Sequence, residues 1–218
     1  MNVVHLCDCM DIMRNMSDKS VDLCITDPPY GIDAGTYGCG SRERKYDRSN
    51  AHNWDSAPPT QKYWDELFRI SKNQIIWGMN NYTLPPCKHF VVWDKKQPDG
   101  VTFAQAELAW TSFDGTSKIF KQSANGQVNR IHPTQKPVAL YKWLLKNYAK
   151  PGDKIFDSHV GSGSIRIACH DMGFDFEGCE IDKDYWEAQE KRYQQHIMQG
   201  DLFSSEDTQK AIYQGVLF

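Results

Sequence analysis

Short apolar runs alternate with polar or glycine-rich segments along the whole chain. Runs of roughly four to eight apolar residues bounded by turn residues are typical of strands buried in a sheet. We expect strands at residues 3–8, 21–26, 74–78, 89–95, 106–112, 154–157 and 176–182. The short connections between the three middle strands indicate a partly antiparallel edge.

Helical periodicity fills several of the intervals between these runs. A helix that begins at Thr60 is expected, because one stripe carries Tyr63, Trp64, Leu67, Phe68 and Ile70. Pro137 is well placed as the first residue of another helix, which Pro151 and Gly152 end. Further helices are expected at residues 9–16, 165–173 and 184–198. The alternation of strands and helices after residue 150 predicts an α/β fold with a parallel sheet and helices on its faces.

The composition fits one globular domain in the cytoplasm. Apolar residues make up 40% of the 218 residues and charged residues 24%, which is ordinary for a soluble globular protein. No run approaches the roughly 18 apolar residues of a membrane span, and the N-terminus lacks a basic-then-apolar signal. We therefore expect one core, no linker and no membrane partner.

The seven cysteines agree with a reducing compartment. Their number is odd, and most of them lie inside apolar runs. Cys7 and Cys9 form a lone CxC without a second pair at zinc-ligand spacing. We expect reduced, packed thiols and no metal.

The net charge of −3 is unevenly distributed. Residues 1–150 hold 19 Lys and Arg against 15 Asp and Glu, whereas residues 151–218 hold 6 against 13. The first part would attract a polyanion and the second would repel it. A solvated surface with uneven charge explains the same numbers, so charge alone identifies no partner.

A glycine turn follows the strand at 154–157, in the sequence DSHVGSGS from Asp157 to Ser164. Gly161 and Gly163 allow the backbone to fold tightly and a ligand to approach it closely. Arg166 stands where a dinucleotide fingerprint has its third glycine, which favours a nucleoside without a pyrophosphate over NAD. Glu180 closes the next strand, where an acid would meet ribose hydroxyls, and Asp182 competes for that role.

The buried strand at 21–26 runs directly into Asp27, Pro28, Pro29 and Tyr30. The two prolines hold the backbone extended and leave two carbonyls without neighbouring amide donors. The Asp27 carboxylate and the Pro28 carbonyl can then accept both hydrogens of an exocyclic amine, which localises the nitrogen lone pair. Tyr30 offers a face on which a base that has swung out of its helix can stack.

Three motifs in fixed order resemble a known family. DPPY at 27–30, HPTQKP at 132–137 and the GSG loop at 161–163 resemble the β-group amino-methyltransferases of DNA, over residues 3–195. The DPPY form resembles the members that methylate adenine N6. The sequence around IIWG and AELAW is similar to that of phage and prophage members. The resemblance implies site-specific methylation of adenine N6, with S-adenosylmethionine as the cofactor and methyl donor.

The family also implies a fold and a set of cofactor contacts. The expected fold is a single-domain Rossmann-like methyltransferase fold with a seven-stranded, mostly parallel sheet, one antiparallel strand and a circularly permuted motif order. Asp8 would reach the adenine of the cofactor, although it reads equally well as an ordinary strand end. The remaining cofactor contacts would come from the HPTQKP and glycine-loop segments, namely His132, Thr134, Lys136, Asp157, His159, Gly161, Ser162, Gly163 and Ser164. The chain departs from the family at Ser158 and His159, where Pro-Phe is usual, and the His159 ring can replace the aromatic wall.

Contacts to double-stranded DNA are expected from two basic groups. The first, directly after DPPY, is Arg42, Arg44, Lys45 and Arg48, and the second includes Lys95 and Lys96. We expect residues 1–198 to form the catalytic domain, with 31–60 and 95–130 as DNA-contacting loops that choose the site. A homodimer is left open, and a solvated loop is the alternative explanation of the basic groups.

Residues 199–218 are expected to form a C-terminal tail with two near-repeats, QGDLF and QGVLF. Both resemble the peptides by which bacterial replication and repair proteins bind the sliding clamp, so Gln214 to Phe218 is a candidate clamp-binding peptide. The alternative is that Leu217 and Phe218 pack onto the core. Two further alternatives concern the whole chain: methylation of cytosine N4, and a nucleic-acid-binding module whose active site has lapsed.

Overall fold

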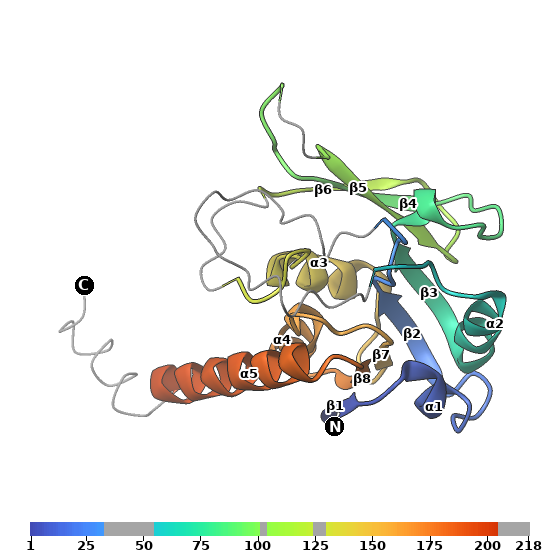
Figure 1. Ribbon diagram of the computed structural model, residues 1–218. Helices are drawn as coiled ribbons and strands as arrows, with labels where there is room; N and C mark the ends of the chain where they lie inside the picture. Colours follow the sequence, from blue (N-terminus) through green and yellow to red (C-terminus); the bar gives the residue numbers. More distant parts are fainter. Residues whose placement is uncertain (33–54, 101–103, 124–129, 205–218) are drawn as a thin grey trace.

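One mixed sheet organises the protein (Figure 1). The computed structural model describes residues 1–32, 55–100, 104–123 and 130–204. Within these ranges the sheet has eight strands: β1 (Asn2–Leu6), β2 (Val21–Thr26), β3 (Ser71–Trp77), β4 (Phe90–Asp94), β5 (Ala106–Thr111), β6 (Lys118–Lys121), β7 (Lys154–Asp157) and β8 (Asp175–Glu180). Their order across the sheet is β1-β8-β7-β2-β3-β5-β4-β6.

The strand directions confirm the predicted mostly parallel sheet. β1, β8, β7, β2 and β3 pair in parallel, β5 is antiparallel to both β3 and β4, and β4 pairs in parallel with β6. Within the described sheet, β5 is therefore the single strand that runs against the others, as expected. β1 pairs with β8, so the first strand of the chain lies beside the last one.

The predicted number of seven strands is wrong, because β6 adds an eighth inside a segment expected to be a loop. β6 has only four residues at the sheet edge, where Ile119 is exposed and Phe120 packs against the core. Its parallel register with β4 places Val92 beside Ile119. A strand this short is held by backbone pairing with its neighbour, so its sequence carries no extended apolar run to predict it.

Helices cover both faces of the sheet (Figure 1). α1 (Cys9–Met13) and α2 (Gln61–Ile70) pack on one face, and α3 (Val138–Tyr148) and α4 (Ser164–Met172) on the other. α5 (Lys183–Ser204) contacts α4, β1 and β8. A short 3₁₀ turn, η2 (Met79–Asn81), follows β3.

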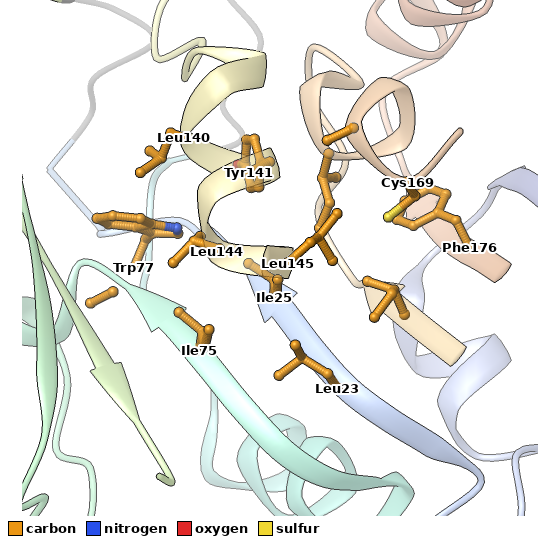
Figure 2. Close-up of a cluster of buried hydrophobic side chains, with 14 of the residues drawn as sticks. Leu23, Ile25, Ile75, Trp77, Leu140, Tyr141, Leu144, Leu145, Cys169 and Phe176 are labelled. Atoms are coloured by element: carbon orange, nitrogen blue, oxygen red, sulfur yellow. The ribbon is translucent and has the colours of Figure 1, made fainter. Parts of the chain in front are cut away.

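Alternate side chains of one strand supply the two cores. Ile75 and Trp77 of β3 pack with Leu140 and Leu144 of α3 (Figure 2). Ile76 packs on the opposite face, in the cluster of α1 and α2. The period of two follows from the strand pleat, and both faces are apolar because helices cover both. Burying one such side chain contributes roughly 1.5–3 kcal/mol.

The element boundaries depart from the prediction at several ends. Thr60 and Pro137 are the residues before α2 and α3 rather than their first helical residues. β3 begins at Ser71, directly after α2, three residues earlier than the apolar run indicates. α5 continues to Ser204, past the expected domain end at residue 198. Among the described helices none combines the length and the apolar character that crossing a membrane requires.

Candidate active site

A cavity lies where the central strands end. Parallel strands β1, β8, β7 and β2 have their carboxyl ends on one edge of the sheet, and ligands of open α/β sheets bind in the crevice outside such ends. The cavity has a volume of about 350 Å³, within the range of small-molecule sites. Both loops that the sequence singled out contribute to its wall.

Most of the predicted site residues line this cavity. They are Asp8, Asp27, Pro28, Pro29, Tyr30, His132, Thr134, Lys136, His159, Gly161, Ser162 and Glu180. Four others lie near the cavity but not on its wall, namely Asp157, Gly163, Ser164 and Asp182. The structure thus brings the DPPY, HPTQKP and glycine-loop segments together around one space.

Asp27 follows β2 and makes two polar contacts with other predicted residues. One carboxylate oxygen accepts a hydrogen bond of 2.6 Å from the Tyr30 hydroxyl, and the other forms an ion pair with the Lys136 ammonium. The Asp27 side chain is 15% exposed and that of Lys136 only 1%. The DPPY and HPTQKP motifs, more than a hundred residues apart, are therefore joined by a direct charge contact.

The Asp27–Lys136 pair is part of a longer chain of alternating charge. Lys136 Nζ also lies 2.9 Å from Glu107 Oε2, and Glu107 pairs in turn with Lys95. Lys95, predicted to contact DNA, is thus engaged by Glu107, and its side chain is 16% exposed. Glu107 itself lies on the antiparallel strand β5 and was not singled out by sequence reasoning, since an acid inside AELAW looks like any half-buried strand residue.

Burial and charge oppose each other in this ion-pair chain. Burial raises the pKa of Asp27, Lys136 opposes that shift, and Glu107 adds to it. Burial alone would lower the pKa of Lys136, but the Asp27 and Glu107 carboxylates outweigh it and the pKa is raised. The pKa of Glu107 falls although burial acts to raise it, because Lys136 and Lys95 prevail. Lys136 therefore stays charged and stabilises the ionised form of its partners.

Tyr82 and Gly78 support the rest of the DPPY segment. The Tyr82 hydroxyl lies 2.7 Å from the Pro28 carbonyl oxygen and 3.1 Å from that of Pro29. The two carbonyls were expected to have no neighbouring amide donor, and they share this hydroxyl as a donor instead. Each carbonyl keeps a further lone pair. A Cβ at Gly78, which has φ of +77°, would lie 2.2 Å from the Tyr30 ring. Only glycine allows this approach, so Gly78 sets the position of Tyr30.

Asp55 holds the end of the DPPY segment from a distant part of the chain. Its Oδ1 accepts hydrogen bonds from the backbone N–H groups of Tyr30, at 2.5 Å, and Gly31, at 2.9 Å. Asp55 is 2% exposed overall and lines the cavity. Sequence reasoning missed this residue because it lies in an irregular segment without a motif, and its partners are backbone groups.

The glycine loop is shaped by the adjoining strand ends and also by distant side chains, since Ser158 contacts Thr26 and Tyr63. Gly161 and Gly163 have positive φ, as the turn predicted. The backbone N–H of Gly161 donates to Glu180 Oε2 at 2.8 Å, and that of His159 donates to Asp157 Oδ1 at 3.0 Å. Burial raises the pKa of Asp157 to about 7. Asp157 therefore orders the loop from beneath rather than facing the cavity.

The structure distinguishes the two acids proposed to meet a ribose. Glu180 lines the cavity, is 8% exposed and accepts from the N–H groups of Gly161 and Asp182. Asp182 Oδ1 instead accepts from the N–H groups of Asp184 and Tyr185 at the start of α5, which makes it a helix cap. Of the two, Glu180 has the position that a ligand in the cavity can reach.

The His132 ring lies beside the glycine loop, where a Cβ at Gly161 would be 3.6 Å from it. Its Nδ1 accepts hydrogen bonds from the Thr134 backbone N–H and hydroxyl, and its ring packs against Tyr185 at 4.3 Å between centroids. Burial lowers the His132 pKa to about 3, with Lys136 and Arg130 adding to the effect. His132 is therefore neutral and adds no charge to the cavity wall.

The cavity wall holds four carboxyl groups, those of Asp8, Asp27, Asp55 and Glu180, and one ammonium, that of Lys136. The site favours a ligand that carries positive charge.

Several predictions fall on residues outside the described ranges. They are the basic residues Arg42, Arg44, Lys45 and Arg48 and the candidate clamp peptide at 214–218. Lys96 is described: its side chain is 52% exposed and lies 3.5 Å from Asp94. No group of three or more metal-ligating side chains occurs in the part of the chain that the structure covers.

Known proteins resemble this chain in sequence and in fold. The profile of the DNA methylase family, N6_N4_Mtase, matches residues 76–191, which is more than half of the chain. The type II methyltransferase M.HpaI of Haemophilus parainfluenzae is 24% identical, over 83% of this chain and 70% of that protein. The type II methyltransferase M2.DpnII of Streptococcus pneumoniae is 29% identical, over 64% of this chain and 48% of that protein. The chain thus spans about half the length of the latter.

Among solved structures, that of the M1.HpyAVI–SAM complex superposes with a TM-score of 0.57 at 20% identity. The superposition covers 88% of this chain and 100% of that one. At this identity the likeness establishes the shared fold.

Proposed function

The chain belongs to the DNA methylase family whose members modify amino groups at adenine N6 or cytosine N4, and from this premise we propose that it methylates adenine N6 at specific sites in double-stranded DNA. S-adenosylmethionine is the cofactor. The choice of adenine follows from the DPPY form of the motif at residues 27–30. The observation that carries the proposal is that Asp27, Pro28, Gly161 and Glu180 line one and the same cavity.

The cavity suits S-adenosylmethionine in both charge and donor groups. The cofactor's sulfonium and ammonium are positive, and the wall holds four carboxyl groups against one ammonium. Glu180 is the residue that would accept hydrogen bonds from the ribose hydroxyls, as an acid at this strand end does in related folds. Gly161 has no side chain to obstruct a ligand at the loop. The cofactor supplies a methyl group on a positively charged sulfur, which makes that methyl group electrophilic.

The protein's task is to make an unreactive amine attack that methyl group. An aromatic amine delocalises its lone pair into the ring, so it must be drawn toward a tetrahedral shape before it reacts. The Asp27 carboxylate and the Pro28 carbonyl both line the cavity and both keep unused lone pairs beside the contacts to Lys136, Tyr30 and Tyr82. They would accept the two amine hydrogens and hold the nitrogen in an attacking orientation.

The charges around Asp27 suit the transition state. Positive charge moves from sulfur to the amine nitrogen during transfer, and the Asp27 carboxylate is placed to stabilise it there. Burial raises the pKa of Asp27, and the Lys136 ammonium opposes this rise and so favours the ionised carboxylate. The methylated nitrogen is acidic and can release its proton to water, so no strong base is required.

Incubation with labelled S-adenosylmethionine and duplex DNA, followed by nucleoside analysis, tests the proposal. We expect the label in N6-methyladenine. Label in N4-methylcytosine would overturn the base assignment and leave the methylase activity in place. Binding of the cofactor without any label in DNA of varied sequence would instead favour a nucleic-acid-binding module.

A further inference from the structure

A buried cluster of hydroxyl groups lies behind His159, the residue at which the chain departs from its family. Ser158 Oγ is 2.8 Å from Thr26 Oγ1, 2.7 Å from the Tyr63 hydroxyl and 2.9 Å from His159 Nδ1. Thr26, Ser158 and Tyr63 are 1%, 2% and 5% exposed. These atoms come from β2, α2 and the loop after β7, so the cluster joins three elements behind the cavity wall.

Counting protons determines which ring nitrogen of His159 carries hydrogen. The Thr26 hydroxyl also contacts the Asp157 carboxylate, which accepts and therefore takes the single Thr26 proton. The 2.8 Å contact between Ser158 and Thr26 then needs the proton of Ser158, because Thr26 has none left to give. With that proton used, Ser158 can only accept from His159. The cluster therefore requires His159 to carry its proton on Nδ1 when Asp157 is ionised.

This tautomer leaves the other ring nitrogen as a hydrogen-bond acceptor. Burial lowers the His159 pKa to about 4, so the ring is neutral and Nε2 has a free lone pair. His159 lines the cavity, and within the described ranges Nε2 has no hydrogen-bond partner of its own. A phenylalanine at this position would present only carbon and hydrogen. The chain has thus placed an acceptor where an apolar wall is usual.

The position of His159 indicates which group of the cofactor it meets. β8 and β7 separate β1 from β2 in the sheet, so Asp8 and Asp27 mark opposite ends of the cavity. Asp8 is the charged side chain whose field acts on the His159 ring. The reacting methyl group belongs at the Asp27 end and the ribose at Glu180. The adenine ring is then the part of the cofactor left for the end beside Asp8 and His159.

We propose that His159 Nε2 accepts a hydrogen bond from the exocyclic amine of the cofactor's adenine, and that the cluster of Thr26, Tyr63 and Ser158 imposes the tautomer that makes this possible. The proposal rests on the use of S-adenosylmethionine and is independent of which DNA base is methylated. It assigns to His159 a selective role, the recognition of adenine over a purine without the amino group. Asp8 and His159 would then both face the adenine, Asp8 by charge and His159 by its lone pair.

Calorimetric binding of two products tests the proposal: S-adenosylhomocysteine, and S-inosylhomocysteine, in which oxygen replaces the amino group. The measurement is made at a pH above the pKa of Asp157. There the wild-type protein should bind the adenosyl form more tightly, by roughly tenfold in addition to any preference that Asp8 causes. A net hydrogen bond contributes about 1 kcal/mol, and an oxygen facing the Nε2 lone pair costs more. His159→Phe should lose this part of the preference. His196→Phe on α5, which exchanges the same residue types outside the cavity, should keep it.

A measurement on the wild-type protein tests the proposal without requiring that the variants fold. Nitrogen-15 chemical shifts of the histidine side chains distinguish the two tautomers, and we expect His159 to show hydrogen on Nδ1. Hydrogen on Nε2, or a wild-type preference retained in full by His159→Phe, would overturn the proposal. Failure of the wild-type protein to bind S-adenosylhomocysteine would overturn the cofactor assignment as well, whereas label in cytosine would leave the role of His159 intact.

Discussion

The DPPY loop at residues 27–31, which we propose is the catalytic loop, and the glycine loop at residues 158–163 both contribute residues to one cavity, but different contacts hold them. The residues that hold the DPPY loop are far away in sequence. Lys136 pairs with Asp27, Tyr82 donates to the two proline carbonyls, and Asp55 accepts from the backbone of Tyr30 and Gly31, while Gly78 leaves space for the Tyr30 ring. Several of these contacts involve full charges. The glycine loop is held by backbone N–H groups that donate to Asp157 and Glu180, on the adjoining strand ends, and by neutral hydroxyl groups.

This difference teaches what each loop needs. The glycine loop takes its turn from backbone geometry at its glycines, and its distant supports, Thr26 and Tyr63, contact Ser158 at the start of the loop. A loop that must hold a carboxylate and a carbonyl on one amine needs its side chains oriented within a fraction of an ångström, which requires support from several elements. The two loops should therefore respond differently to mutation: changes around the catalytic loop should affect transfer, and changes around the glycine loop should affect cofactor affinity.

The largest effect is expected from Asp27→Ala. Methyl transfer should fall by at least about 10²-fold, because one of the two acceptors on the amine is lost and the charge that stabilises it disappears. Cofactor affinity, measured by calorimetry, should change little, since the glycine loop is untouched. Full transfer activity in this variant would refute the role assigned to Asp27.

Gly78→Ala should come next. The added methyl group would lie 2.2 Å from the Tyr30 ring and must displace it, and a displacement of about 1 Å in an active site can cost 10²-fold in rate. Single-turnover transfer should slow while cofactor affinity stays near that of the wild type. Gly152→Ala is the matched control, because Gly152 also has a positive φ, +90°, but nothing within 4 Å. Equal losses in the two variants would attribute the effect to backbone strain alone.

The reverse pattern is expected for Glu180→Gln. Hydrogen bonds to a charged group contribute roughly 1.5–3 kcal/mol, so cofactor affinity should fall by about tenfold or more. Asp182→Ala should instead lose a helix cap, lowering stability by about 1 kcal/mol and leaving cofactor affinity nearly unchanged. Calorimetry and thermal unfolding of both variants separate the roles. A stronger binding loss in the Asp182 variant would reverse the assignment of the ribose contact.

The smallest effect is a shift in the pH profile of Glu107→Gln. Transfer requires ionised Asp27, so activity falls as the pH drops through the Asp27 pKa, which burial raises and the Glu107 charge raises further. Removing that charge lowers the Asp27 pKa, and the acidic limb of kcat/KM should move to lower pH. An unchanged limb would show that the charge of Glu107 does not reach the reaction centre, and a move to higher pH would contradict the sign of its effect on Asp27.

The sequence was informative where structure depends on local pattern. The apolar runs predicted β2 and β7, the positive φ of Gly161 and Gly163 was expected from the turn, and the three motifs predicted which loops share the cavity. The sequence did not predict the short edge strand β6 or the junction of α2 with β3. Both are defined by backbone pairing with neighbouring strands and not by an apolar pattern in their own residues.

The sequence also did not predict two residues, Glu107 and Asp55, that hold the DPPY loop in place. Glu107 and Asp55 act on residues eighty and twenty-five positions away, through a buried ion pair and two backbone amides. Such partners are chosen by the folded arrangement of strands and carry no spacing rule that one sequence reveals. Lys95 illustrates the converse: its charge suggested contact with DNA, while the fold pairs it with Glu107.

The most direct test is the distance from a flipped adenine's N6 to two oxygens, Asp27 Oδ and Pro28 O, in a crystal structure with duplex DNA and S-adenosylhomocysteine. We expect both distances to be about 2.7–3.2 Å, the range of hydrogen bonds to an amine. An amine held elsewhere in the cavity, with the Asp27 carboxylate still occupied only by Lys136 and Tyr30, would contradict the account.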